Sequence, residues 1–169
     1  FQFRPAGGAW GPSELVDSSP ACSGSQMLPE IALDGAGNAY VVWRESHNLS
    51  TPPDITYLRV RSPGGTGGAR ETRTSGFAVN GIALSVTGDG TVHVVYERPG
   101  DLYHISKPSG GSWSAPYQFV TAANSQSAPD LAVDGDTLYV VWTDGRSGND
   151  DIYSIMRSNA GVWSLEEQV

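Results

Sequence analysis

The sequence predicts an all-β protein built from repeated four-stranded antiparallel units. Turn-forming residues are abundant, with 21 glycines and 11 prolines, whereas charged residues make up only 17% of the 169 residues. That composition is typical of many short strands joined by tight turns. No stretch longer than two turns has the periodicity of an amphipathic helix. Three segments of the chain can be aligned with one another, and such an internal repeat decides the architecture.

Each repeat begins with an apolar segment, a Gly/Asp-rich turn and a second apolar segment, which together predict a β-hairpin. The second segment ends on an aromatic residue, and these residues, 53 and then 46 positions apart, are Trp43, Tyr96 and Trp142. The first segments are apolar throughout and are centred on Ala32, Ala83 and Ala132. We therefore expect a first strand that is buried on both faces, with small residues where neighbouring sheets approach most closely.

An aspartate followed by an aliphatic residue opens a third strand in each repeat, at Asp54, Asp101 and Asp151. A glycine-rich turn then leads to a tryptophan and a more polar fourth strand, at Trp113 and at Trp163. In the first repeat, residues 64–68 contain no tryptophan. Four strands in about fifty residues is the spacing of a β-propeller blade.

The repeats divide the chain into three full blades, residues 25–75, 76–124 and 125–169. Trp10 stands in the same context as Trp113 and Trp163. Residues 1–24 are therefore interpreted as an outer half-blade, formed by a third and a fourth strand, followed by a linker. A closed propeller needs at least four whole blades. We expect the chain to be a propeller segment, completed by further blades from a longer chain or from other copies.

The charge of the chain argues against several classes of partner. The formal net charge is −8, and the ten lysines and arginines are scattered singly. Nucleic-acid binders usually show a basic patch, so no nucleic-acid partner is expected. No apolar run approaches the roughly 18 residues of a membrane span, so no membrane insertion is expected.

Two sequence features concern the environment of the chain. The single cysteine, Cys22, cannot form an internal disulfide; it is interpreted as a small loop residue, with an intermolecular bridge as the alternative. Asn48 begins an Asn-Leu-Ser glycosylation sequon, which matters only where a glycosylating machinery is met. The acidic charge favours an exposed, non-cytoplasmic setting, and we expect an extracellular or cell-surface location.

Acidic residues recur beside the connection between second and third strands. Glu45, Glu97 and Asp144 precede it, and Asp54, Asp101 and Asp151 follow it. Paired carboxylates can perform acid–base chemistry. A feature repeated in every blade is more often structural, however, and Asp commonly caps turns. The candidates for ligand binding are the polar residues near these strand ends: Arg44, Glu45, Arg98, Asp144 and Arg146.

No metal site or cofactor is expected, although one loop suggests an alternative. Residues 144–151 are rich in side-chain oxygens, which Ca²⁺ prefers, but they lack the EF-hand spacing. His47 and His104 have no partner at metal-ligand spacing. His93 occupies the strand position of Tyr40 and Tyr139, so it is predicted to be a core residue.

The aromatic residues are interpreted first as structural repeat positions. Trp43, Tyr96 and Trp142 end buried strands, which favours packing between blades over sugar stacking. Trp10, Trp113 and Trp163 lie nearer the surface, and we expect each to cover its own turn.

Residues 139–153, with the Gly-Val-Trp163-Ser element that follows, resemble the repeats of bacterial secreted sialidase-like (BNR, or Asp-box) propellers. An Asp-box runs Ser/Thr-x-Asp-x-Gly-x-x-Trp; here the tryptophan is kept, whereas Pro108 and Ser158 stand where the aspartate belongs. The resemblance implies that the box is a folding element. It also implies three arginines, a Tyr–Glu pair and an Asp as sialidase catalytic residues. Phe3-Arg4-Pro5 is similar to the signature of the first arginine, but the repeat places Arg4 in an outer strand, so no catalytic residue is assigned.

The preferred interpretation is a non-catalytic binding or structural module of a secreted or cell-surface protein. Carbohydrate is the first ligand class to test, with a protein surface as another possible partner. Two alternatives remain: a fragment of an exo-sialidase or related glycoside hydrolase, and a self-assembling surface subunit. Fold alone does not choose among them.

Overall fold

The computed structural model describes residues 2, 4, 7–17, 24–46, 55–63, 65, 67–74 and 79–169. Cys22, His47, Asn48 and Asp54 lie outside these residues, so the predictions made for them are not addressed by the structure. The described residues form no helix long and apolar enough to cross a membrane.

The described strands form three four-stranded antiparallel sheets, in the manner of partial propeller blades, which confirms the predicted fold class. Each sheet runs in chain order from its inner to its outer strand. The first blade contains β1 (Ser25–Leu33), β2 (Ala39–Ser46), β3 (Ile55–Arg61) and β4 (Glu71–Thr74). The second contains β5 (Ile82–Val86), β6 (Val92–Arg98), β7 (Asp101–Lys107) and β8 (Tyr117–Gln118). The third contains β9 (Gln126–Asp134), β10 (Thr137–Asp144), β11 (Asp151–Arg157) and β12 (Glu167–Gln168).

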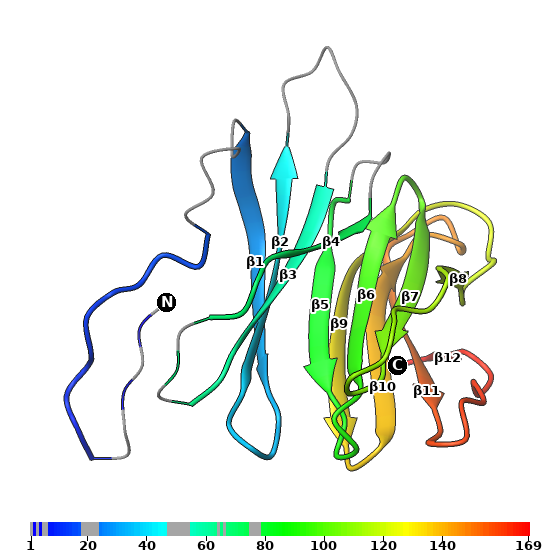
Figure 1. Cartoon of the computed structure of the whole chain (residues 1–169). Helices are drawn as coiled ribbons and strands as arrows, with labels where there is room; N and C mark the ends of the chain where they lie inside the picture. Colours follow the sequence, from blue (N-terminus) through cyan, green and yellow to red (C-terminus); the bar gives the residue numbers. More distant parts are fainter. Residues whose placement is uncertain are drawn as a thin grey trace.

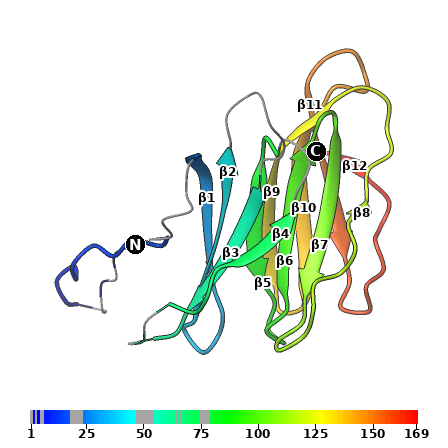
Figure 2. The same cartoon turned by 45° about the horizontal axis from the view of Figure 1, so that its top comes forward.

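The three blades stand side by side like a fan, and their inner strands β1, β5 and β9 are neighbours (Figures 1 and 2). The N-terminal segment, drawn in blue, lies beyond the first blade, on the side away from the second. Residues 7–17 form no strand, although a third and a fourth strand were predicted within residues 1–24. The interpretation of these residues as an outer half-blade stays a prediction.

The inner hairpin of the first blade forms because a short polar side chain closes its turn. The Asp34 carboxylate accepts hydrogen bonds from the backbone N–H groups of Ala36 (3.0 Å) and Asn38 (2.9 Å) and from the Tyr40 hydroxyl (3.0 Å). Asp and Asn favour such local bonds, which hold a turn without the help of a neighbouring strand. This turn reverses the chain so that Leu33 pairs with Ala39 and the two apolar strands lie in register.

Two apolar clusters hold the blades together. One fills the space between the first and second blades and includes Val42, Leu58 and Val94, each 1% exposed. The other fills the space between the second and third blades and includes Leu138, Val140 and Trp142. Gly81 permits the close approach there, because a Cβ atom at this position would lie 2.9 Å from Cδ of Pro129 in the third blade.

Burial on both faces is realised only in the inner strand of the second blade, where Ile82, Ala83 and Leu84 are all buried. In the first blade Ile31 is 55% exposed and Leu33 is 63% exposed. The prediction of full burial is therefore wrong for β1, and for Ala132 in β9, because one face of each outer blade is not covered by another blade.

The register also corrects the predicted equivalence of the central alanines. Ala32 pairs with Tyr40 and Ala132 pairs with Tyr139, whereas the residue opposite His93 is Ser85. Ala83 lies two residues earlier and pairs with Val95. A shift of two residues keeps a side chain on the same face of a strand, so the apolar pattern alone could not reveal it.

Candidate functional site

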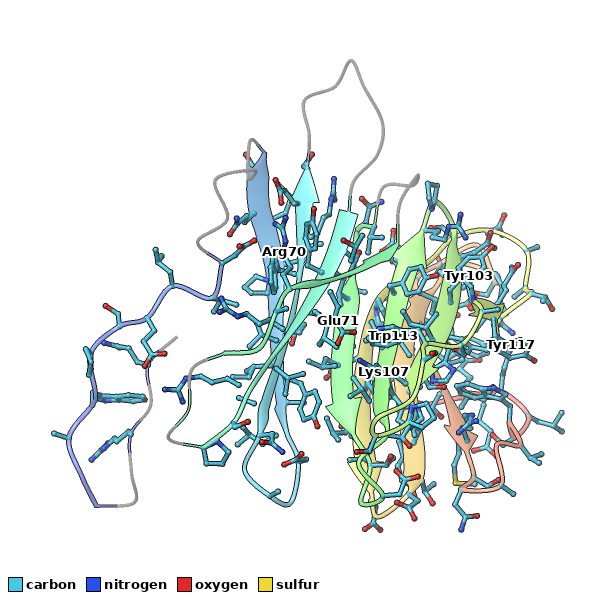
Figure 3. All side chains as sticks on the ribbon, viewed as in Figure 1. Arg70, Glu71, Tyr103, Lys107, Trp113 and Tyr117 are labelled. Atoms are coloured by element: carbon cyan, nitrogen blue, oxygen red, sulfur yellow. The ribbon has the colours of Figure 1, made fainter. Side chains whose placement is uncertain are left out.

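A pocket lined by Lys107 opens between the first and second blades, and we call this boundary the groove. A carboxylate, an ammonium group and an indole come together at it. Both oxygens of Glu71, at the start of β4, lie 2.7 Å from Nζ of Lys107, at the end of β7. Nε1 of Trp113 donates a hydrogen bond of 3.3 Å to Oε2 of the same carboxylate. These side chains converge from the two blades (Figure 3). We call Glu71, Lys107 and Trp113 the groove triad.

The turn that follows β7 explains why Trp113 reaches this groove. Gly110 has φ of 68°, a left-handed conformation that favours glycine, and the N–H of Gly111 donates to the carbonyl of Pro108. The returning chain is then fixed to β7 by two bonds between Ser106 and Ser114: the backbone N–H of Ser114 donates to the Ser106 carbonyl (2.8 Å), and the N–H of Ser106 donates to Oγ of Ser114 (3.0 Å). Trp113 is therefore held beside Lys107.

The groove triad remains accessible to solvent. The side chain of Glu71 is 41% exposed and that of Lys107 is 20% exposed. An exposed ion pair of this kind adds little stability, so its groups can exchange partners with a ligand at small cost.

A pocket of about 120 Å³ continues from Lys107 between the two blades. Its apolar wall is formed by the side chains of Leu58, Val60 and Val92, and its polar groups belong to Tyr40, Lys107 and Ser109. Small-molecule sites commonly combine an apolar wall with a few polar groups that fix orientation. The pocket and the groove triad together form the candidate site.

The described residues contain no group of three or more His, Cys, Asp or Glu side chains placed to hold a metal ion. The candidate site itself offers one carboxylate acceptor, one ammonium donor, hydroxyl groups and an indole. Such a set can hydrogen-bond a polyhydroxylated ligand while an apolar surface packs on its C–H groups.

Two of the predicted ligand-binding residues, Asp144 and Arg146, are paired with each other in the third blade. Asp144 is 0% exposed and accepts hydrogen bonds from Nε1 of Trp142 (2.8 Å), from the backbone N–H of Arg146 (2.9 Å) and from Nη2 of Arg146 (2.6 Å). Although burial acts to raise it, the pKa of Asp144 is lowered by its hydrogen bonds with Arg146 and Trp142. Arg146 also reaches Glu166 at 2.5 Å, and hydrogen bonding to Asp144 raises the pKa of its guanidinium. The arrangement holds the β10–β11 connection against the blade.

The other predicted ligand-binding residues are Arg44 and Glu45 in the first blade and Arg98 in the second. Glu45 is 1% exposed and lies 3.5 Å from Arg70, while Arg44 donates to the carbonyl of Val79 at the start of the second blade. Arg98 lies over the ring of Tyr103, 4.9 Å from its centroid. The five candidates do not converge on one site, and their role in ligand binding stays a prediction.

The register separates the recurring acids of the sequence into two sets. Glu45 and Asp144 each stand two residues after the strand-ending tryptophan, but Glu97 stands one residue after Tyr96. Glu97 is therefore on the opposite face, where its carboxylate accepts from the backbone N–H of Ala128 in the third blade (3.4 Å). The residue of the second blade that is equivalent to Glu45 and Asp144 is Arg98, two positions after Tyr96. Counting positions from the strand-ending aromatic residue could have shown this equivalence.

An arginine lies over a third-strand tyrosine in every blade, which the sequence did not predict. The distances from the guanidinium carbon to the ring centroid are 4.0 Å for Arg70 and Tyr57, 4.9 Å for Arg98 and Tyr103, and 4.1 Å for Arg146 and Tyr153. Each tyrosine contacts the aromatic residue that ends the second strand, with centroids 5.6 to 6.1 Å apart. The arginines come from three different places in the repeat, so no alignment of the repeats would group them.

The groove between the second and third blades is filled differently. Trp163 stacks on Phe119, with centroids 4.9 Å apart and planes 6° apart, and it meets His104 edge to face at 5.3 Å. Tyr117 of β8 pairs with His104 in the same register in which Glu71 of β4 pairs with Leu58. Tyr117 therefore occupies, in the second blade, the position that Glu71 has in the first. Trp113 and Trp163 both contact the preceding blade, a role that the sequence did not predict, and their cover of their own turns stays a prediction. The polar groove belongs to the first pair of blades.

Comparison with solved structures shows the fold. A Hadza microbial sialidase is 15% identical, with a TM-score of 0.60, over 92% of this chain and 37% of that protein. The Aleuria aurantia lectin in complex with α-methyl-L-fucoside is 19% identical, with a TM-score of 0.58, over 95% of this chain and 50% of the lectin. The catalytic domain of a Coprinopsis cinerea GH62 α-L-arabinofuranosidase is 10% identical, with a TM-score of 0.57, over 90% of this chain and 53% of that domain.

The chain thus spans about half or less of the length of these propeller proteins. No protein-family model and no curated protein sequence matches the chain. The likeness therefore extends to the propeller fold that a sialidase, glycosidases and a lectin share.

Proposed function

We propose that the chain is a non-catalytic carbohydrate-binding propeller module whose ligand site is the groove between its first and second blades. The observation that carries the proposal is the groove triad, in which Glu71, Lys107 and Trp113 meet at an accessible edge beside a pocket. A carboxylate and an ammonium group can bind adjacent hydroxyl groups of a sugar, one as acceptor and the other as donor.

Trp113 gives the site its preference for a ring with an apolar face. Its indole nitrogen is directed to Glu71, so the ring is fixed and does not need to be ordered when a ligand arrives. Rigid aromatic side chains provide contact area at a low cost in conformational entropy. A pyranose ring that packs against this indole would place its hydroxyl groups near Lys107 and Glu71.

The comparisons support this class of ligand without assigning it. The matched proteins include a lectin in complex with a methyl fucoside, a sialidase and an arabinofuranosidase, and all of them are described by a sugar ligand or a glycosidase activity. The proposal includes an extracellular or cell-surface location, as the sequence suggests.

Glycan-array screening of the chain, followed by calorimetric titration with the strongest ligand, tests the proposal. Trp113→Phe and Glu71→Gln should each weaken binding by about tenfold or more, because each removes a group that is fixed in the groove. Trp163→Phe and Glu167→Gln are the matched controls, since they change the corresponding positions of the third blade. Binding that all four variants retain would place the site elsewhere and overturn the assignment.

The glycosidase alternative is tested with the same protein. Incubation with fluorogenic sialosides and arabinosides should give no turnover if the chain is a binding module. Turnover that Glu71→Gln abolishes would instead make the groove a catalytic site and refute the non-catalytic role.

A further inference from the structure

The third blade carries an apolar face that the described residues leave open. On it Tyr139 is 45% exposed, Val141 39%, Ile152 48% and Met156 41%. We call these four residues the open face. The same strand positions in the second blade are covered by the third, and there His93 is 3% exposed while Val95 and Leu102 are 0% exposed. The open face therefore has the composition of a surface that receives another blade.

At the edge of the open face, Glu167 occupies the position that Glu71 has in the first blade. Glu167 of β12 pairs with Ser154, in the same register in which Glu71 of β4 pairs with Leu58. Glu71 receives Lys107 from the following blade at 2.7 Å. Glu167 is exposed. By analogy with Glu71, it could form an ion pair with a Lys or Arg at the end of the third strand of another blade.

The first blade has the complementary surface at the other end of the chain. Ile31 and Leu33 are more than half exposed on it. Beside them lie two adjoining hollows of about 180 and 250 Å³, both lined by Val16 and Val41. Arg61 ends β3, as Lys107 ends β7, and is bound by Glu14 at 2.9 Å. At the outer edge the Glu14–Arg61 contact thus resembles the Glu71–Lys107 contact, while the described residues leave the inner part of the surface unfilled.

We infer that two copies of this chain join head to tail, with the open face of each covering the first blade of the other. Ile152 and Val141 would then pack on Ile31 and Leu33, and Glu167 would take the place of Glu14 on Arg61. The contact repeats the chemistry of the two interfaces between blades that the chain already contains.

The three blades of one chain form an arc of the propeller ring, and the size of this arc favours a closed dimer over an open-ended polymer. The three blades match half of the fucoside-bound lectin. Two such arcs, each joined to the other through the same heterologous contact, would complete one ring, and contacts of this kind close when the rotation allows it. This inference does not rest on the proposed sugar site, which lies inside each chain.

Sedimentation equilibrium of the full chain tests the inference. We expect twice the mass of one chain, and Ile152→Lys should shift the association constant toward the monomer by about a hundredfold, because it puts a charge into an apolar contact. Ile152 is solvent-exposed, so its substitution should leave the blades folded. Val162→Lys, at a 67% exposed apolar residue in the turn after β11, is the matched control and should leave the mass unchanged.

A charge exchange tests the orientation of the two copies. Glu167→Lys should weaken association by about tenfold by placing a lysine beside Arg61, and adding Arg61→Glu should restore it. A chain that is monomeric at all concentrations would overturn the inference, whether the open face is unused or receives blades of another polypeptide. Indefinite polymers, or a dimer that the charge exchange does not affect, would overturn the closed head-to-tail arrangement.

Discussion

Nδ1 of His93 lies 3.0 Å from Nε2 of His104, in the interface between the second and third blades. The two rings are stacked, with centroids 5.2 Å apart, and both side chains are buried. Because one nitrogen must donate and the other accept, the contact requires at least one neutral imidazole. Trp163 covers His104 from the third blade, so the pair is part of the contact that holds the two blades together.

Acid should destabilise the fold through this pair. Burial, and in addition the charge of Arg157, lowers the pKa of His93 to about 4. Burial, and in addition the charges of His93 and Arg157, lowers the pKa of His104 to about 3. In the unfolded chain both would titrate near 6.5, so the unfolded state binds more protons between these values. The stabilisation is present above pH 6.5 and is lost as the pH falls toward 4. Thermal denaturation from pH 7.5 to pH 4 should show a steady fall in Tm. The accompanying loss in the free energy of unfolding should be roughly 6 kcal/mol, about 3 kcal/mol for each histidine.

The control for this prediction comes from the first blade. Leu58 stands in β3 where His104 stands in β7, since each pairs with the second-strand residue just before the strand-ending aromatic. His104→Leu should therefore be tolerated and should flatten the acid limb. A variant as acid-sensitive as the native chain would assign the effect to carboxylates elsewhere.

Hydrophobic alternation and turn chemistry allowed the fold to be predicted from the sequence, whereas contacts between blades could not be predicted. The run from Tyr139 to Trp142 and the Asp-Gly turn before it sufficed for a hairpin. The groove triad depends on Glu71, which is separated from Lys107 by 36 positions and belongs to the one repeat without its tryptophan. The histidine pair was missed because the two residues lie diagonally on adjacent strands, His93 opposite Ser106 and His104 opposite Val95.

Ala128 has φ of 49°, in the left-handed region, at the irregularity where β9 breaks register with β10. A residue with a Cβ atom is strained there, the more so because Pro129 follows. Ala128→Gly should therefore raise the free energy of unfolding by up to about 1 kcal/mol. Ala132→Gly, at a regular position of the same strand, should lower it by about the same amount, as denaturant titration of the two variants would show. A loss of stability in both variants would mean that Ala128 is not strained.

Asp144 should be the carboxylate whose loss costs the most stability among those described. Asp144→Ala would leave Nε1 of Trp142 and the guanidinium of Arg146 without their main acceptor, and breaking a buried pair in this way costs about 3 kcal/mol or more. Because the pKa of Asp144 is lowered in the folded state, its contribution is present above the ordinary Asp pKa and is lost as the pH falls below it.

Glu166→Gln is the matched control for Asp144, since Arg146 keeps its bonds to Asp144 in that variant. Urea denaturation should show a loss several times smaller than that of Asp144→Ala. Equal losses of stability in the two variants would indicate that Asp144 and Glu166 contribute equally. Binding of the Arg146 guanidinium by either acid would then be what holds the β10–β11 connection.

Trp163 should stabilise the boundary between the second and third blades far more than Trp10 stabilises the N-terminal segment, although the two occupy equivalent positions in the sequence. Trp163 stacks on Phe119 and covers His104, so Trp163→Ala would remove an aromatic stack and open a buried histidine pair to water. Losses of about 3 kcal/mol are typical of such truncations. Trp10 is 63% exposed, and its replacement by alanine should change the free energy of unfolding by less than about 0.5 kcal/mol. Guanidinium titrations followed by circular dichroism would measure both. Similar losses for the two variants would show that Trp10 is held against a surface as Trp163 is, and would contradict the contrast drawn from their burial.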